Sequence, residues 1–170
     1  MNQQSLDGAI KIRSDLWSIK ELLSEDELNC LLSAIENETD WIKIQEQRNL
    51  NREQVAWKPD GLCDWLWCKL SELDFSRLGL KFRTAMIWKD QPGYKIRNHF
   101  DNDRVTGAMQ IYLSQDRTDL GTWFENSVEI PFKQNTGYIM HNKNRLIHGM
   151  KKPVPDNYVR LSFYALFDHI

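Results

Sequence analysis

Two histidines and one aspartate stand at a spacing that is suited to holding a metal ion. His99 and Asp101 lie two positions apart, and side chains two apart on an extended segment point to the same face. A second imidazole from a distant strand, His148, completes a set of two histidines and one carboxylate. Such a set occupies one face of an octahedral ion and leaves the opposite face open to other ligands. The sequence therefore predicts a metal site formed by His99, Asp101 and His148.

Other side chains compete for the same roles. An H-x-D pair also arises by chance as a surface pair, and Asp103 stands close enough to compete with Asp101. His141 lies seven residues before His148 and is the rival for the second imidazole. The spacing to a later arginine favours His148, so we expect His141 to be structural or to lie at the surface. Whether His141 contributes to the site stays open.

An arginine in the most β-rich stretch of the chain is a candidate anion-binding residue. Because side chains alternate along a strand, Arg160, Ser162 and Tyr164 share one face, while Leu161 and Phe163 share the other. The planar fork of Arg160 and the hydroxyl of Ser162 could together bind a carboxylate. The alternative is a solvated polar face on an edge strand.

The elements that must position these residues differ between the two parts of the chain. In residues 1–79, Ala9–Ile19 is predicted to contain a strand, and Ser24 with Glu27 forms a capping box that opens a helix. Trp41–Gln47 alternates like a half-buried strand. A second helical pattern, residues 62–73, follows a Pro-Asp-Gly turn. These elements predict helical support and outer strands.

After Gly79 the chain turns into short β-rich runs separated by turn residues. Eight such runs without a helical pattern between them predict a closed or double-layered antiparallel structure. The predicted fold class is α+β, mainly β, with the helices bracing one face of a jelly-roll-like (cupin-like) sandwich. No linker divides residues 1–170, which we expect to form a single domain. The runs are Leu80–Lys89, Tyr94–His99, Val105–Ser114, Gly121–Phe124, Val128–Phe132, Thr136–His141, Arg145–Gly149 and Tyr158–Phe167.

Composition narrows the classes of protein. A hydrophobic fraction of 41% and a charged fraction of 27% are those of a globular protein, and the net charge of −2 argues against a nucleic-acid binder. No apolar run approaches the roughly 20 residues that span a bilayer, and the N-terminus lacks a secretory pattern. We therefore expect a cytoplasmic protein with no membrane partner. The three cysteines are expected to be reduced core thiols. The oligomeric state is not readable.

The order of these motifs resembles the Fe(II)/2-oxoglutarate-dependent dioxygenases. H-x-D, an interval of about fifty residues, a second histidine and then Arg-x-Ser follow one another as in that superfamily. The flanking residues look like its prolyl-4-hydroxylase-like branch, in the small phage or bacterial form. The similarity covers about residues 80–168, in the segments Ile87–Asp101 (IWKDQPGYKIRNHFD), Gln110–Leu113 (QIYL), Leu120–Phe124 (LGTWF), Thr136–Ile139 (TGYI) and His148 through Phe167.

The resemblance implies a double-stranded β-helix core at residues 80–168 and assigns roles to the residues. The two histidines and Asp101 would be the iron ligands and catalytic centre. Arg160 would bind the distal carboxylate of 2-oxoglutarate, assisted by Ser162 and Tyr112. With Fe(II), 2-oxoglutarate and O₂, the implied activity is hydroxylation of an unactivated C–H bond of an amino acid or a peptidyl, prolyl-type substrate. Succinate and CO₂ would be released.

The substrate is the open question at this stage. Family members place a tyrosine three positions before the first metal histidine, where this chain has Ile96, and many use lysine where it has Arg160. Both departures leave a peptidyl-proline substrate in doubt. Arg104 and Arg145 flank the motif and could hold an anionic substrate group, or be ordinary loop charges, and Trp123 could wall the pocket or pack in the core. The alternatives are a cupin-like metalloenzyme without a 2-oxo acid and a non-enzymatic β-sandwich binding module.

Overall fold

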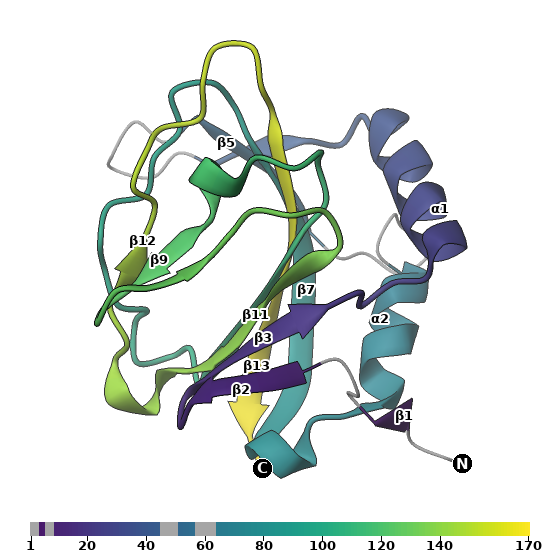
Figure 1. The fold of residues 1–170 in the computed structure, drawn as a ribbon. Helices are drawn as coiled ribbons and strands as arrows, with labels where there is room; N and C mark the ends of the chain where they lie inside the picture. Colours follow the sequence, from purple (N-terminus) through teal and green to yellow (C-terminus); the bar gives the residue numbers. More distant parts are fainter. Residues whose placement is uncertain (1–3, 6–8, 45–50, 57–63) are drawn as a thin grey trace.

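Two antiparallel β-sheets face each other, and two helices cover the outer face of the larger sheet (Figure 1). This arrangement holds for residues 4–5, 9–44, 51–56 and 64–170, which the computed structural model describes. The larger sheet has the order β2-β3-β11-β8-β13-β7-β5-β4, and the smaller one has the order β10-β9-β12. The smaller sheet lies across the face that the helices leave uncovered.

The strands of both sheets are short apart from β7 and β13, which pair along the centre of the larger sheet. Two further strands, β1 and β6, form a separate parallel pair. In the larger sheet the strands are β2 (Ala9–Arg13), β3 (Leu16–Lys20), β4 (Ile42–Lys43), β5 (Arg52–Ala56), β7 (Leu80–Asp90), β8 (Gly107–Tyr112), β11 (Thr136–His141) and β13 (Arg160–His169). The others are β9 (Thr122–Phe124), β10 (Val128–Ile130), β12 (His148–Gly149), β1 (Gln4–Ser5) and β6 (Leu73–Asp74).

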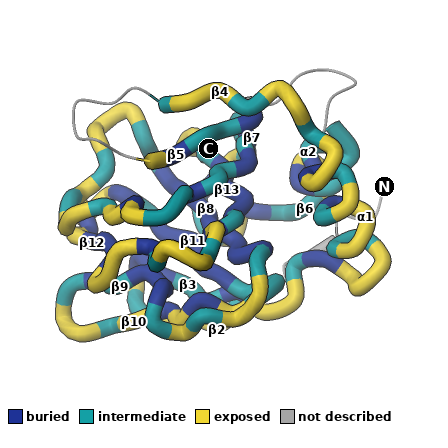
Figure 2. Tube along the Cα trace, turned by 90° about the horizontal axis from the view of Figure 1, so that it is seen from above, coloured by how far each residue is buried: buried dark blue, intermediate teal, exposed yellow. Residues whose placement is uncertain are grey.

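Alternation along the central strands creates two cores. On β13, Phe163 and Ala165 pack against the helices, while Tyr164 points to the smaller sheet. The same parity holds on β8, where Ile111 faces the helices and Tyr112 faces the smaller sheet. Figure 2 shows the buried positions concentrated on these central strands. The predicted division of β13 into two faces is confirmed, and the polar face of Arg160 points between the sheets.

The first helix, α1 (Glu25–Glu36), begins at the predicted capping box. Ser24 Oγ accepts a hydrogen bond from the Glu27 amide at 3.3 Å, and Glu27 Oε2 accepts one from the Ser24 amide at 2.7 Å. Leu31 and Ile35 bury its apolar face. The second helix, α2 (Asp64–Glu72), is tied to α1 by an ion pair of 2.6 Å between Lys69 and Glu27. Both helices pack as braces on the larger sheet.

Three predictions of local structure need correction. Tyr94–His99 is not a strand, because its backbone pairs only intermittently with residues 148–154 and forms no continuous ladder. Ala9–Ile19 begins a hairpin of two strands, β2 and β3, rather than one. Cys30 and Cys68 are exposed and not core residues. Cys63, Leu62 and the end of the predicted strand Trp41–Gln47 lie outside the described residues, and β4 covers only Ile42–Lys43.

Neither α1 nor α2, the helices of the described residues, is long and apolar enough to cross a membrane.

Candidate metal centre

The two predicted histidine ligands are joined by their backbones. His99 and His148 form an isolated antiparallel bridge, with reciprocal amide-to-carbonyl hydrogen bonds of 2.9 and 2.8 Å. Gly149 permits this approach, because a Cβ at that position would lie 3.0 Å from the carbonyl oxygen of Arg97. A segment some fifty residues away in sequence is thereby held beside the H-x-D motif.

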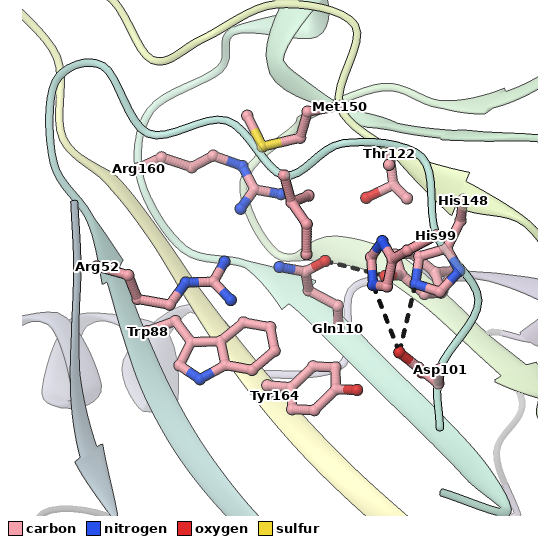
Figure 3. A pocket seen from close by; sticks show the side chains of 13 residues that line it. Arg52, Trp88, His99, Asp101, Gln110, Thr122, His148, Met150, Arg160 and Tyr164 are labelled. Carbon is pink, nitrogen blue, oxygen red and sulfur yellow. Dashed lines mark hydrogen bonds and ion pairs between the residues drawn. The ribbon is translucent and has the colours of Figure 1, made fainter. Parts of the chain in front are cut away.

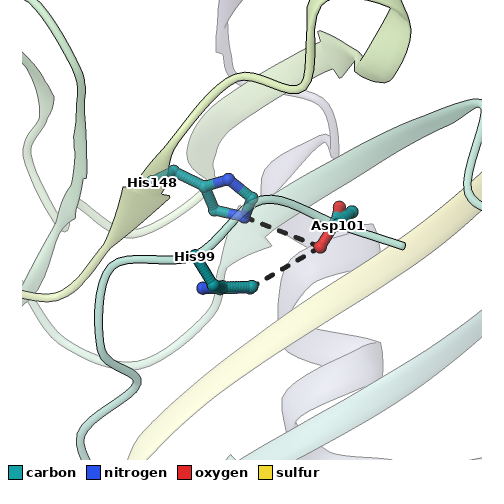
Figure 4. A group of neighbouring side chains, drawn as sticks. All are labelled: His99, Asp101 and His148. Atoms are coloured by element: carbon teal, nitrogen blue, oxygen red, sulfur yellow. Dashed lines mark ion pairs between the residues drawn. The ribbon is translucent and has the colours of Figure 1, made fainter. Parts of the chain in front are cut away.

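Both imidazoles are oriented in the same way by main-chain carbonyls. His99 Nδ1 lies 2.9 Å from the Arg97 carbonyl oxygen, and His148 Nδ1 lies 2.9 Å from that of Leu146. A ring that donates through Nδ1 keeps its lone pair on Nε2, and a carbonyl partner of this kind is typical of metal-binding histidines. The two Nε2 atoms converge on Asp101 Oδ1, at 3.6 Å from His99 and 3.8 Å from His148 (Figure 4).

The geometry of this group fits a metal ion better than an ion pair. The three ligand atoms lie within 4.8 Å of one another, at separations too long for direct hydrogen bonds. Asp101 Oδ2 is buried and has no hydrogen-bond partner in the part of the chain that the structure describes. A bound cation would satisfy this carboxylate. The predicted trio is thus brought together as one candidate metal site.

Burial and the carboxylate act in opposite directions on the two rings. Burial lowers the pKa of His148, and the nearby charge of Asp101 only partly offsets this effect. Burial also lowers the pKa of His99, but the hydrogen bonds to Asp101 and to the Arg97 carbonyl outweigh it and raise the pKa. The more exposed ring is therefore the one that Asp101 charges more readily.

A buried asparagine that the sequence analysis did not single out holds the loop after the motif. The Nδ2 group of Asn142 lies 3.2 Å from the carbonyl oxygens of Asp101 and Asn102 and 2.9 Å from that of Val105. Asn142 is 7% exposed. The backbone of Asp101 is therefore fixed from a different strand end, the one that follows β11.

The rival ligands lie elsewhere. The ring of His141 packs 5.0 Å from that of His169, and its Nδ1 accepts a hydrogen bond from the Lys143 amide at 3.1 Å. Asp103 is exposed and lies 3.8 Å from Arg145. Among the described residues the potential metal-binding group contains only His99, Asp101 and His148, so neither His141 nor Asp103 belongs to it.

A pocket of about 370 Å³, including its open mouth, extends from the histidines between the two sheets. Figure 3 shows the imidazoles and Asp101 at one end and the guanidinium groups of Arg160 and Arg52 at the other. The walls between the two ends are mainly aromatic and apolar. The lining residues are Arg52, Trp88, Ile96, His99, Asp101, Gln110, Thr122, Tyr138, His148, Gly149, Met150, Arg160 and Tyr164.

Arg160 is one of the most deeply buried side chains, at 1% exposed. Its Nη1 donates to Asp90 Oδ2 at 2.6 Å, and its Nε donates to the Leu120 carbonyl at 3.2 Å. The guanidinium lines the pocket, as the predicted role requires, yet it shares a carboxylate with Arg52. Sequence reasoning missed both Asp90 and Arg52, because neither belongs to a motif.

Ser162 and Tyr112 stand behind the lining rather than in it. Ser162 Oγ accepts a hydrogen bond of 2.9 Å from Gln110 Nε2, and Tyr112 donates to Thr122 Oγ1 at 2.8 Å. Gln110 and Thr122 in turn line the pocket. Burial raises the pKa of Tyr112, although the charge of Arg160 partly offsets it, so the phenol stays a neutral donor. The structure thus places both predicted residues as supports of the polar wall.

The three predicted substrate residues do not line this pocket. Arg145 lies over the ring of Phe100 at 4.0 Å, and the Arg104 carbonyl accepts a hydrogen bond from Arg83. Trp123 alternates with Thr122 along β9, so that only Thr122 faces the pocket.

Aromatic side chains that sequence reasoning assigned to neither role form the floor and one wall. Trp88 and Tyr164 stack with ring centroids 3.9 Å apart. Tyr138 donates to Gln110 Oε1 at 3.0 Å and completes a chain of hydrogen bonds to Ser162. Burial raises the pKa of Tyr138 and of Tyr164 far above that of a free phenol. The alternation of β8, β11 and β13 was the signal that would have placed these rings.

Comparison with known proteins identifies the fold. No family model and no curated protein matches the sequence. Among solved structures, a viral collagen prolyl hydroxylase from Paramecium bursaria Chlorella virus-1, in complex with 2-oxoglutarate, matches with a TM-score of 0.65 and 19% identity, over 91% of this chain and 96% of that one. The chain has the fold of the 2-oxoglutarate-dependent oxygenases. The predicted α+β, mainly β class and its double-stranded β-helix core are thereby confirmed.

Two further structures with this oxygenase fold cover its range. A prolyl hydroxylase from Trichoplax adhaerens, in complex with a peptide fragment of hypoxia-inducible factor, has a TM-score of 0.72 and 16% identity, over 92% of this chain and 84% of that one. HygX from Streptomyces hygroscopicus, with nickel and 2-oxoglutarate bound, has a TM-score of 0.68 and 10% identity, over 96% and 84%. Low identity combined with broad coverage shows a shared fold.

Proposed function

We propose that this protein is an Fe(II)- and 2-oxoglutarate-dependent oxygenase that hydroxylates an unactivated C–H bond of an amino acid or a peptidyl, prolyl-type substrate. One observation carries the proposal. A two-histidine, one-carboxylate group and a buried arginine line opposite ends of the same pocket. Two histidines and a carboxylate with open positions are typical of non-heme Fe(II) oxygenases.

The residues present fit both groups that the fold family implies. His99, Asp101 and His148 would hold the iron, since their ligand atoms converge and Asp101 Oδ2 lacks a partner among the described residues. Arg160 would hold the distal carboxylate of 2-oxoglutarate through its guanidinium. When bound with O₂, these groups would supply oxidative decarboxylation of 2-oxoglutarate to succinate and CO₂, coupled to oxidation of a C–H bond.

The chain's own contribution is orientation and exclusion of water. Main-chain carbonyls orient both imidazoles, and Asn142 fixes the loop that carries Asp101. The stacked rings of Trp88 and Tyr164 present an apolar wall between the two ends of the pocket. Water excluded from such a site strengthens the electrostatic interactions inside it.

The substrate class is the least constrained part of the proposal. Prolyl hydroxylases stand among the similar structures, one of them with a peptide bound, whereas HygX has been solved with hygromycin B. Ile96 lines the pocket where the resemblance leads one to expect a tyrosine. An amino acid or a short peptide therefore fits the proposal, and the test substrates should include both free and peptidyl proline.

Two other functions make different predictions. A cupin-like metalloenzyme without a 2-oxo acid would keep the histidines and Asp101 but would have no use for a guanidinium at the far end of the pocket. A non-enzymatic binding module would need neither. The burial of Arg160 in the pocket wall favours the oxygenase over both.

Anaerobic titration of the protein with Fe(II) and 2-oxoglutarate tests the proposal. We expect the weak visible charge-transfer band of the chelated complex, followed by succinate formation on admission of air. His99→Ala should abolish the band. If wild-type protein shows neither band nor succinate, the oxygenase proposal is wrong.

Arg160→Lys separates the role of the arginine from that of the metal ligands. Lysine keeps the charge but loses the planar fork that reaches both Asp90 and the Leu120 carbonyl. We expect 2-oxoglutarate to bind about tenfold more weakly while Fe(II) affinity stays at the wild-type level. Equal loss of both affinities would show that Arg160 serves folding instead.

A further inference from the structure

Three charged residues stand side by side across three neighbouring strands of the larger sheet. Asp90 ends β7 and is the register partner of Arg52 on β5 and of Arg160 on β13. Cross-strand neighbours on one face have Cβ atoms close enough for their side chains to interact. The sheet topology therefore forces the two arginines onto opposite sides of one carboxylate.

The carboxylate is shared between both guanidinium groups. Arg52 Nε donates to Asp90 Oδ1 at 2.5 Å and its Nη2 donates to Oδ2 at 3.1 Å, which is a bidentate contact. Arg160 Nη1 donates to the same Oδ2 at 2.6 Å. Asp90 is 0% exposed and Arg52 is 7% exposed. Two buried cations with one buried anion leave one uncompensated positive charge.

Arg52 is held rigidly in this position. Its guanidinium carbon lies 3.8 Å from the ring centroid of Trp88 and 4.3 Å from that of Tyr94. Contacts of this kind with aromatic faces are favourable for a cation that is shielded from water. The group cannot swing to solvent without losing these contacts and both bonds to Asp90.

The excess charge faces the pocket. Arg52 and Arg160 both line it, at the end opposite to the histidines (Figure 3). A guanidinium has five N–H donors, and the recorded hydrogen bonds use two on each arginine. Donors and charge both remain for one further carboxylate. Burying an unpaired charge is costly, so an incoming anion is stabilised at this end of the pocket.

We propose that Arg52 is a second co-substrate-binding residue, which receives the distal carboxylate of a 2-oxo dicarboxylic acid together with Arg160, while Asp90 holds both guanidinium groups in place. This inference rests on the proposed function and adds to it a residue from β5, outside the segment that resembles the oxygenases. It makes the anion site a paired-arginine site rather than one that depends on Arg160 alone.

The test compares two ligands that differ only in the distal carboxylate, 2-oxoglutarate and 2-oxopentanoate. Each is titrated calorimetrically into Mn(II)-loaded protein without turnover. We expect Arg52→Met to weaken 2-oxoglutarate binding by about tenfold or more, the scale of one charged hydrogen-bonded contact, and to leave 2-oxopentanoate unchanged. Arg83→Met is the matched control, because Arg83 pairs with Asp168 at the surface and lines no part of this pocket.

A double variant distinguishes contact from charge balance. Arg52→Met with Asp90→Asn keeps the net charge of the cluster at the wild-type value and avoids a carboxylate with only one partner. We expect it to remain several-fold weaker than wild type for 2-oxoglutarate, because it lacks the donors of Arg52. If Arg52→Met does not fold, the double variant alone decides the question.

Three results would overturn the inference. Arg52→Met could bind 2-oxoglutarate as tightly as wild type, it could lose both ligands equally, or the double variant could recover wild-type affinity. The last result would mean that Arg52 only neutralises Asp90. Failure of the wild-type protein to bind 2-oxoglutarate would instead refute the proposed function, so the two failures are distinguishable.

Discussion

Asn142→Ala should weaken metal binding although Asn142 touches no metal ligand atom. Its side-chain amide has two N–H groups, which are shared among the carbonyls of Asp101, Asn102 and Val105 at 2.9 to 3.2 Å. At most two full hydrogen bonds form at one time. At about 0.5–1.5 kcal/mol for each bond, the substitution should cost about 1–3 kcal/mol of unfolding free energy.

The effect on the metal follows from where the lost bonds lie. They hold the loop whose first residue is Asp101, so its carboxylate gains freedom relative to the two imidazoles. Removing a group that orients a ligand lowers metal affinity by roughly 10- to 100-fold. We expect a loss at the lower end of this range for Mn(II), because the His99–His148 bridge is untouched.

Asn144→Ala is the control for this prediction. Asn144 is in the same short helical turn as Asn142, and its Nδ2 donates to Asp15 Oδ2 at 2.9 Å, away from the metal group. Both variants should lower the urea midpoint, but only Asn142→Ala should lower Mn(II) affinity measured by electron paramagnetic resonance. Equal Mn(II) affinities in the two variants would refute the reasoning.

Two further predictions concern the bridge and the helices. Gly149→Ala should weaken Mn(II) binding, because the new Cβ would lie 3.0 Å from the Arg97 carbonyl oxygen and push the two histidine segments apart; unchanged affinity in the same titration would contradict this. The pKa of Glu27 lies below its ordinary value of 4.5, because bonds to Lys69 and Ser24 outweigh the opposing effect of burial. The carboxylate therefore stabilises the fold above pH 4.5 and loses this effect as the pH falls through the lower folded pKa. Glu27→Gln should cost about 0.5–1 kcal/mol near pH 7 and almost nothing near pH 3, and urea unfolding at the two pH values checks it.

The metal centre was predictable because its determinants are local. H-x-D places two ligands on one face by strand geometry alone, and the alternation of β13 puts Arg160 on the inner face. The capping box at Ser24 likewise needs only residues three apart. The structure brings each of these groups to its predicted place.

The paired arginines were not predictable from the same patterns. Arg52 lies 38 residues before Asp90, and Asp90 lies 70 before Arg160. Only the strand order β13-β7-β5 makes the three residues neighbours, and no periodicity encodes that order. The failed strand at Tyr94–His99 has a related cause, since its partner is the irregular segment 148–154, so pairing occurs at scattered positions.

The charges at the two ends of the pocket explain why a dicarboxylate suits it. Histidines hold a metal in their neutral form, so a divalent cation with Asp101 carries a net charge of +1. At the other end Arg52, Arg160 and Asp90 also carry +1, whereas Arg160 and Asp90 alone would be neutral. An acid with a carboxylate at each end neutralises both, but a monocarboxylate leaves one end unpaired in a buried site. Arg52 therefore sets the sign of the far end, and with it the preference for a second carboxylate.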